Sequence, residues 1–338
     1  MSAIWVPLAI AAAIVLPASW LATWAVLQRL RRRGILDRPN ERSSHAVPTP
    51  RGGGIAIVST VLPAWAVIAL AHYTGREPLI AAAAAGILAS VSWLDDRQGL
   101  SPGTRLLVQV VCVAIGLAAL PGAGLVFQGW LPPQLDLVAS GVLLLWFVNL
   151  FNFMDGIDGI AGSEAACIGG GIALLSALHP TEIGMGAGLL GTTIAAAALG
   201  FLWWNWQPAR LFMGDVGSVP VGFLLGWLLL ALAAAGFWAP AFILPLYFLA
   251  DASWTLLRRL ARGDKIWQAH REHFYQYAVQ AGRSHAAVVR RVLLADLALV
   301  ALAAVAAEGA VWIAIVLAAA TVAVLLADLS RHRKPAAP

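Results

Sequence analysis

Residues Asn149–Gly162 read NLFNFMDGIDGIAG and join two long apolar runs, Leu137–Asn152 and Gly162–Leu178. Its amides and carboxylates make this stretch too polar to face lipid, where a polar group without a partner is costly. Each flanking run is close to the roughly 20 residues that a helix needs to cross a bilayer. The sequence therefore predicts two membrane-spanning helices with a polar, functional turn between them.

The whole chain repeats this alternation. Of its 338 residues, 60% are hydrophobic and 12% are charged, which is about half the charge of an average soluble domain, and the mean hydropathy is +0.80. We expect an all-α, polytopic membrane bundle of about 11 transmembrane helices in a single domain, residues 1–338. The predicted spans are Ile4–Leu27, Gly54–His72, Pro78–Leu94, Thr104–Leu120, Leu137–Asn152, Gly162–Leu178, Ile183–Phe201, Val219–Ala235, Pro240–Leu257, Val288–Ala306 and Ala310–Leu329.

The basic residues indicate an orientation. If the connector after the first span is cytoplasmic, Arg76 is the only one of the 22 Lys and Arg residues that falls outside, as the positive-inside rule favours. The N-terminus is then periplasmic and the C-terminus cytoplasmic. The polar residues gather in five cytoplasmic connectors, 29–53, 95–104, 153–161, 202–218 and 258–287. Their charge suits anionic headgroups or phosphates, whereas they lack any motif that reads nucleic acid.

In the quoted stretch, Asn149, Asn152, Asp155 and Asp158 recur at every third position. On a continuous helix this spacing would spread them over half the circumference. We expect the glycine after each aspartate to break the helix, so that the last two carboxylates fold back toward one pocket. Oxygen-bearing side chains of this kind suit Mg²⁺, which favours one or two carboxylates together with substrate phosphates.

Two other segments carry carboxylates at span ends. Asp95 and Asp96 are adjacent, so they repel each other unless a cation, a hydrogen-bond network or a shared proton compensates; they suit Mg²⁺ or a proton from a phosphate, and a solvated loop is the alternative. Asp215 lies between glycines in FMGDVGS, at the start of a span where backbone N–H groups can meet a phosphate. Alone, this second motif is equally typical of a turn or helix cap.

The remaining candidates are basic. His270, Arg271 and His273 lie in the last large connector, where they suit a pyrophosphate better than zinc because no third close ligand is present. Arg51 precedes three glycines, so the backbone there can approach a ligand closely. A solvated loop and a plain loop-to-helix junction are the respective alternatives. Asp251 and Asp296 fall within late spans, where interhelix hydrogen bonding explains them as well as function does.

These motifs occur in a fixed order on alternating connectors: Asp95-Asp96, NLFNFMDGIDG, Asn205 with FMGDVGS, and His270-Arg271-x-His273. In this the chain resembles the polyprenyl-phosphate N-acetylhexosamine-1-phosphate transferase superfamily (glycosyl transferase family 4), over essentially its whole length. Within it, the chain is most similar to the bacterial enzymes that initiate O-antigen and teichoic-acid-type glycans. The alternative within the superfamily is a phospho-MurNAc-pentapeptide translocase. Those enzymes carry three consecutive histidines, which this loop lacks, so the pattern argues against their substrate.

The resemblance implies a function. A sugar 1-phosphate (GlcNAc, QuiNAc or FucNAc type) would pass from a UDP-N-acetylhexosamine to undecaprenyl phosphate at the cytoplasmic face of the bacterial inner membrane. Mg²⁺, or Mn²⁺ in its place, would be the cofactor, membrane lipids would surround the protein, and a homodimer is common among relatives. The implied metal ligands are Asn152 and Asp215; the implied catalytic residues are Asp95, Asp96, Asp155, Asp158, Asp215, His270 and His273; the implied substrate-binding residues are Arg51, Asn149, Asn205, Phe212 and Arg271.

One departure from the family pattern is at Arg97-Gln98-Gly99, where many relatives carry a lysine after the paired aspartates. Arg97 and Arg105 are both candidates to replace it. The rival from another class is a secondary transporter or lipid flippase, which would place its ionisable groups near the bilayer midplane on broken helices. Here most acids fall at span ends, so the enzyme is favoured.

Overall fold

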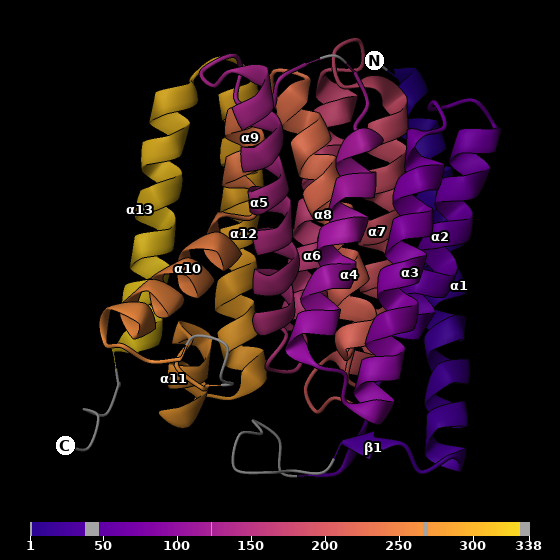
Figure 1. The fold of residues 1–338 in the computed structure, drawn as a ribbon, viewed down its shortest axis with the longest axis vertical. Coiled ribbons are helices and arrows are strands. Elements are labelled where there is room, and N and C mark those ends of the chain that lie inside the picture. Colours follow the sequence, from indigo (N-terminus) through magenta and orange to yellow (C-terminus); the bar gives the residue numbers. More distant parts are fainter. Residues whose placement is uncertain (1, 38–46, 123, 266–269, 332–338) are drawn as a thin grey trace.

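The computed structural model describes residues 2–37, 47–122, 124–265 and 270–331. Long, roughly aligned helices form a bundle, with one strand pair at its lower end (Figure 1). The two strands, β1 (Leu36–Asp37) and β2 (Thr49–Pro50), pair antiparallel. The helices are α1 (Ser2–Arg32), α2 (Gly54–Leu70), α3 (Glu77–Gln98), α4 (Pro102–Ala118), α5 (Pro133–Phe153), α6 (Ile160–Leu178), α7 (Gly184–Asn205), α8 (Asp215–Ala234), α9 (Trp238–Ile243), α10 (Leu246–Ala261), α11 (Phe274–Gln280), α12 (His285–Ala307) and α13 (Val311–Ser330).

The all-helical, polytopic architecture is confirmed, apart from the short strand pair. Within the described residues, seven helices are long and apolar enough to cross a membrane, namely α1, α3, α5, α6, α7, α8 and α13, and α2 and α4 are shorter apolar helices. All eleven predicted spans fall on helices, but the ninth, Pro240–Leu257, is split between α9 and α10. Pro245 explains the break, because proline lacks an N–H and clashes with the preceding turn. The count of eleven spans stays a prediction.

Helix α8 is the central element. In its apolar window, 94% of residues are buried, against 22% for α1 and for α13. Its first turn packs against the start of α2, where Gly54 and Gly217 meet with no room for a side chain on either. The backbone N–H of Gly54 donates to the carbonyl of Met213 at 2.9 Å. The chain just before α2 is therefore fixed against the residues that lead into α8.

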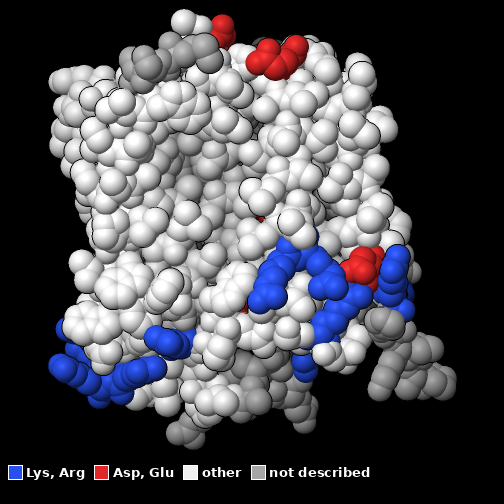
Figure 2. All heavy atoms as spheres, turned by 180° about the vertical axis from the view of Figure 1, so that it is seen from behind, with Lys and Arg blue, Asp and Glu red and all other residues white. Residues whose placement is uncertain are grey.

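Charge is distributed unevenly along the bundle. The face in Figure 2 shows a broad band without charge, arginines and lysines toward the lower end, and acidic groups at the upper end. We call the lower end, which carries the α1–α2, α3–α4, α5–α6, α7–α8 and α10–α12 connections, the basic end. The two termini lie at opposite ends of the bundle (Figure 1), as an odd number of crossings would require.

Candidate active site

Arg51 connects two of the predicted motifs. Its backbone forms a parallel bridge with Phe212, and the N–H groups of Gly52 and Gly53 donate to the Phe212 carbonyl at 3.2 and 2.8 Å. The Arg51 Nη2 then lies 2.8 Å from Asp215 Oδ1 and 3.1 Å from Asp96 Oδ1. The backbone therefore places one guanidinium between carboxylates from α3 and α8.

The turn into α8 explains why Asp215 points to this place. Gly214 has a φ of 72°, a conformation that glycine adopts at little cost. A Cβ at this position would lie 3.3 Å from Asp96 Oδ2. Asp215 is then the first residue of α8, where the helix dipole stabilises an anion. Its side chain is 23% exposed, so it is reachable from solvent.

More negative than positive charge gathers around Arg51. Burial raises the pKa of Asp155 well above its usual range, Arg51 opposes this, and the neighbouring carboxylates of Asp215, Asp158 and Asp96 add to the rise. Asp96 Oδ2 is buried and has no hydrogen-bond partner among the described residues. Asp96 and Asp215, which pair with Arg51, thus share its single positive charge with the nearby Asp155, and a divalent ion would balance their negative charge better.

The donor chemistry fits magnesium better than zinc. Within the described residues no cluster of three or more His, Cys, Asp or Glu side chains forms a ready-made metal cage. Mg²⁺ does not need one, because it is held by one or two carboxylates and completes its shell with water and substrate phosphates. Asp215 and Asn152 line the same cavity, and Asn152 uses only its Nδ2 to donate to Ser218 Oγ at 2.8 Å.

That cavity, of about 190 Å³, lies between α3, α4, α5 and α8. Asp95 faces it, accepts from the backbone N–H of Leu100 at 2.7 Å, and pairs with Arg105 at 3.0 Å. Asn149 also lines it and donates to Gln109 at 2.9 Å. Arg97 instead lies over the Trp93 ring at 5.7 Å. Of the two arginines that could replace the family's lysine, Arg105 is the one beside the aspartates.

Asp158 and Asn205 hold backbone segments beside the site in place. The Asp158 carboxylate accepts from the backbone N–H of Ala209 at 3.1 Å and lies 3.2 Å from His285 Nδ1. Asn205, which is buried, accepts from the N–H of Gly159 and donates to the carbonyl of Leu211, each at 2.9 Å. Both residues tie the DGIDG turn to the segment before α8. Sequence reasoning missed His285, because its only signal is its position at a helix start.

We expect Asn205→Ala to lower stability more than activity per folded molecule. The change leaves a buried N–H and a buried carbonyl without partners, and each of these groups lowers the free energy of unfolding by about 1–3 kcal/mol. The melting temperature in detergent should fall, while the fraction that stays folded retains measurable turnover. Asn149→Ala, which removes an amide from the half-buried cavity wall, is the matched control and should melt close to the wild type.

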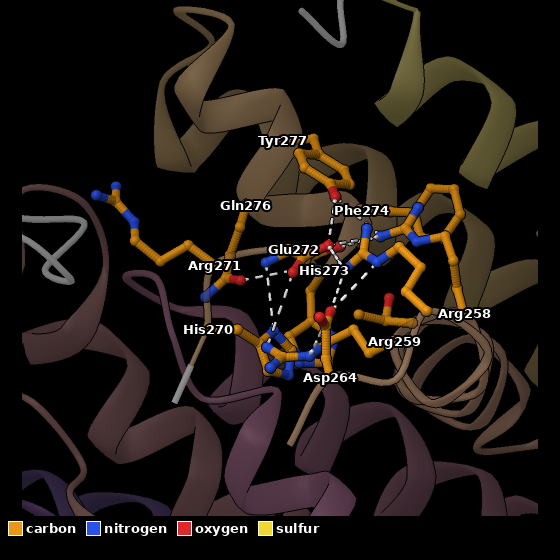
Figure 3. Close-up of polar contacts among 12 residues, drawn as sticks. Arg258, Arg259, Asp264, His270, Arg271, Glu272, His273, Phe274, Gln276 and Tyr277 are labelled. Atoms are coloured by element: carbon orange, nitrogen blue, oxygen red, sulfur yellow. Dashed lines mark hydrogen bonds and ion pairs between the residues drawn. The ribbon is translucent and has the colours of Figure 1, made fainter. Parts of the chain in front are cut away.

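The histidine loop adjoins the DGIDG turn. Tyr275, buried in α11, donates its hydroxyl to the carbonyl of Phe153 at 3.2 Å. The same hydroxyl oxygen occupies the place where a side chain on Gly156 would stand. Figure 3 shows Glu272 at the centre of ion pairs with Arg258 and Arg259, with the Tyr277 hydroxyl also directed at it, whereas Arg271 extends away from this cluster. His270 and His273 precede α11, and their ring centroids are 4.8 Å apart.

The two histidines differ in environment. His273 is 2% exposed, with its Nδ1 3.2 Å from the buried carboxylate of Asp251. His270 is half-buried, and burial together with the nearby His273 and Arg259 lowers its pKa to about 4. His270 is therefore neutral near pH 7. Near pH 7, His270 therefore adds no positive charge to the loop.

The lowered pKa of His270 predicts a dependence of stability on pH. As the pH falls from about 7 to about 5, the unfolded chain takes up a proton at this residue near its ordinary pKa, but the folded protein does not. The wild type should therefore lose stability relative to His270→Asn over this interval, and the difference should level off below about pH 4. Thermal melts of both proteins across this range test it; parallel curves would contradict it.

A larger apolar groove opens on the other side of α5. It has a volume of about 710 Å³ and is walled by α5, α8, α9, α10 and α13. Trp146 and Phe147 face it about one turn from Asn149, which lines the polar cavity. An apolar chain lying in this groove could therefore bring a polar head toward the basic end.

The chain is similar to known transferases over most of its length. Residues 78–233 match the model of glycosyl transferase family 4. The chain is 27% identical to a probable undecaprenyl-phosphate N-acetylglucosaminyl 1-phosphate transferase of Bacillus subtilis (83% of this chain, 80% of the relative). It is 29% identical to a decaprenyl-phosphate N-acetylglucosaminephosphotransferase of Mycolicibacterium smegmatis (82% and 76%), and 28% identical to the undecaprenyl-phosphate alpha-N-acetylglucosaminyl 1-phosphate transferase of Escherichia coli K12 (75% and 71%).

The matched region runs from α3 through α8 and so contains Asp95, Asp96, the DGIDG turn and Asp215. The chain is therefore similar to the glycosyl transferase family 4 model over this region, and to polyprenyl-phosphate N-acetylglucosamine-1-phosphate transferases over most of its length.

Proposed function

We propose that this protein transfers an N-acetylhexosamine 1-phosphate from a UDP-sugar to undecaprenyl phosphate, giving a polyprenyl-diphosphate sugar and UMP. The observation that supports this most strongly is the convergence of Asp95, Asp96, Asp155 and Asp215 around Arg51 and Arg105 at one end of the bundle. Phosphoryl transfer needs such positioning and charge neutralisation more than covalent chemistry. The relatives named above act on related lipids and GlcNAc phosphate.

In this proposal the lipid phosphate attacks directly. One of its oxygens forms a bond to the β-phosphorus of the UDP-sugar, and the bond from that phosphorus to the oxygen shared with the α-phosphate breaks, so UMP leaves with the electron pair. Arg105 would hold the lipid phosphate, and Asp95, 3.0 Å from Arg105, would orient it or accept its proton. The apolar groove along α5 would take the isoprenoid chain.

The nucleotide would lie on the opposite side of Arg51. Phe212 would stack on the uracil, and Arg271 with His270 would contact the diphosphate or sugar. Asp215 and Asn152 would hold Mg²⁺, for which Mn²⁺ would substitute, and the ion would neutralise the diphosphate when bound. Asp96, which pairs with Arg51 at 3.1 Å, would add negative charge beside the ion.

The basic end would face the cytoplasm of a bacterial inner membrane, because basic residues concentrate there. A soluble UDP-sugar and a membrane lipid can meet at that surface. The product would start a cell-surface glycan of the O-antigen type. A homodimer would be compatible with the exposed apolar faces of α1 and α13.

Purified protein with undecaprenyl phosphate and Mg²⁺ tests this proposal. We would add UDP-GlcNAc, UDP-QuiNAc, UDP-FucNAc and UDP-MurNAc-pentapeptide in separate reactions and measure UMP and lipid-linked sugar. We expect product from one of the first three, with UDP-GlcNAc the first choice given the relatives. Product only from the pentapeptide donor would assign the protein to the translocases. Lipid movement that needs a sealed vesicle and releases no UMP would support the transporter instead.

A further inference from the structure

Asp251 of α10 is a buried carboxylate on which the histidine loop converges. It is 0% exposed. His273 Nδ1 lies 3.2 Å from its Oδ1, and the backbone N–H groups of Phe274 and Tyr275 donate to it at 3.0 and 3.4 Å. Three donors from the loop therefore meet one carboxylate of the membrane bundle.

The same carboxylate also receives donors from its own helix. Tyr247 and Thr255, one turn before and one turn after Asp251, donate their hydroxyls at 3.3 and 3.4 Å. These two bonds lie within α10 and reach no part of the loop. They satisfy further lone pairs of this buried side chain.

The contacts continue from Asp251 to the candidate metal site. The His273 ring stacks on Tyr275 at 5.7 Å between centroids, and the Tyr275 hydroxyl donates to Phe153, the last residue of α5 and the neighbour of Asn152. On the other side, His270 packs on His273 at 4.8 Å. The position of His270 relative to the DGIDG turn is thus set through residues that Asp251 holds.

We propose that Asp251 is a positioning residue, which locks His273 and the start of α11 so that His270 and Arg271 stand at a fixed place beside the carboxylates of the candidate site. The inference rests on the function proposed above. His273 is then an anchor within the protein, and His270 and Arg271 are the loop residues that meet the substrate. Because a carboxylate can only accept, His273 carries its proton on Nδ1.

A small displacement would be costly. A misplacement of about 1 Å in a group that contacts the reacting atoms can lower a rate about 100-fold without preventing binding. Asp251→Ala should therefore lower kcat about 100-fold and change KM for the lipid little. Asp251→Asn keeps an acceptor for Phe274 N–H in the same shape, so it should recover part of the loss. Thr255→Val removes a donor to the same carboxylate but none from the loop, and should keep near-wild-type kcat.

The test pairs these kinetics with hydrogen exchange and ¹⁵N-histidine NMR, which need no substrate. In Asp251→Ala, exchange should rise in residues 270–280 and not in α6–α8, and the Nδ1–H signal of His273 should be lost; Thr255→Val should change neither. Unchanged exchange in Asp251→Ala, or faster exchange with unchanged kcat, would overturn the positioning role. A wild type without turnover on any donor would overturn the proposed function, while the exchange data would still decide whether Asp251 anchors the loop.

Discussion

Asp215→Asn is expected to lower kcat/KM about 1,000-fold while the bundle stays folded. The change keeps the size of the side chain at the first residue of α8 but removes the charge that would bind the metal, and losing one such group typically costs about 100- to 1,000-fold. The Arg51–Asp215 pair is partly exposed, so its loss should alter stability little. The measurement is UMP release at saturating lipid, with a thermal melt of the same preparation.

Asp264→Asn is the matched control for this variant. Asp264 is also a carboxylate at the basic end and pairs with Arg262 at 2.7 Å, but it lies in the connection after α10 and touches no residue of the cavity between α3 and α8. The same chemical change there should leave turnover within about two-fold, as for most surface substitutions. Full activity in Asp215→Asn would remove that residue from the metal site.

Arg51→Gln is expected to reduce turnover about 100-fold and, at the same time, to tighten divalent-cation binding. Arg51 pairs with both Asp96 and Asp215, so removing it leaves two carboxylates with a greater need for a cation. Turnover falls because the guanidinium that would hold the diphosphate is gone. Arg51→Lys keeps the charge without the planar fork and should recover only part of the rate.

Opposite changes in turnover and metal affinity distinguish this account from simple damage to the fold. Arg262→Gln is the control, because Arg262 also bridges two carboxylates, Asp264 and Glu272, at a distance from the cavity. It should change neither quantity. If Arg51→Gln weakened cation binding as well as turnover, the carboxylates would depend on Arg51 for their geometry and the balance of charge argued above would be wrong.

The fold was largely predictable from the sequence because a membrane-spanning helix requires a long apolar run, and each predicted run is helical. The break at Pro245 was missed because proline is common in membrane helices, and only packing decides whether it bends or ends one. The grouping of Asp95, Asn152 and Asp215 was also predicted, since all three stand at helix ends that lie at the basic end of the bundle.

Individual roles were less predictable than proximity. Asn205 and Asp158 looked like substrate-facing residues, yet their side chains are used in bonds to Gly159, Leu211, and Ala209. Nothing in the spacing of motifs distinguishes a residue that supports a turn from one that contacts a ligand. The Asp251–His273 contact joins residues 22 positions apart across a loop, a pairing that the helical period cannot indicate.

The sequence predicts that residues of the His270 loop and of the segment Arg42–Arg51 select the sugar; of the latter, residues 42–46 lie outside the described residues. The donor panel tests the choice among N-acetylhexosamines, and the described residues place Arg51, Asp96 and Asp215 together at the candidate metal site.

The central claim is that carboxylates from separate connectors form one divalent-cation pocket at the basic end. Its most direct test is Mn²⁺ binding followed by electron paramagnetic resonance in the presence of UDP, for the wild type, Asp215→Asn and Asp264→Asn. We predict a single tightly bound ion per chain that is lost in Asp215→Asn and kept in Asp264→Asn. Equal binding in all three proteins would show that the ion sits elsewhere.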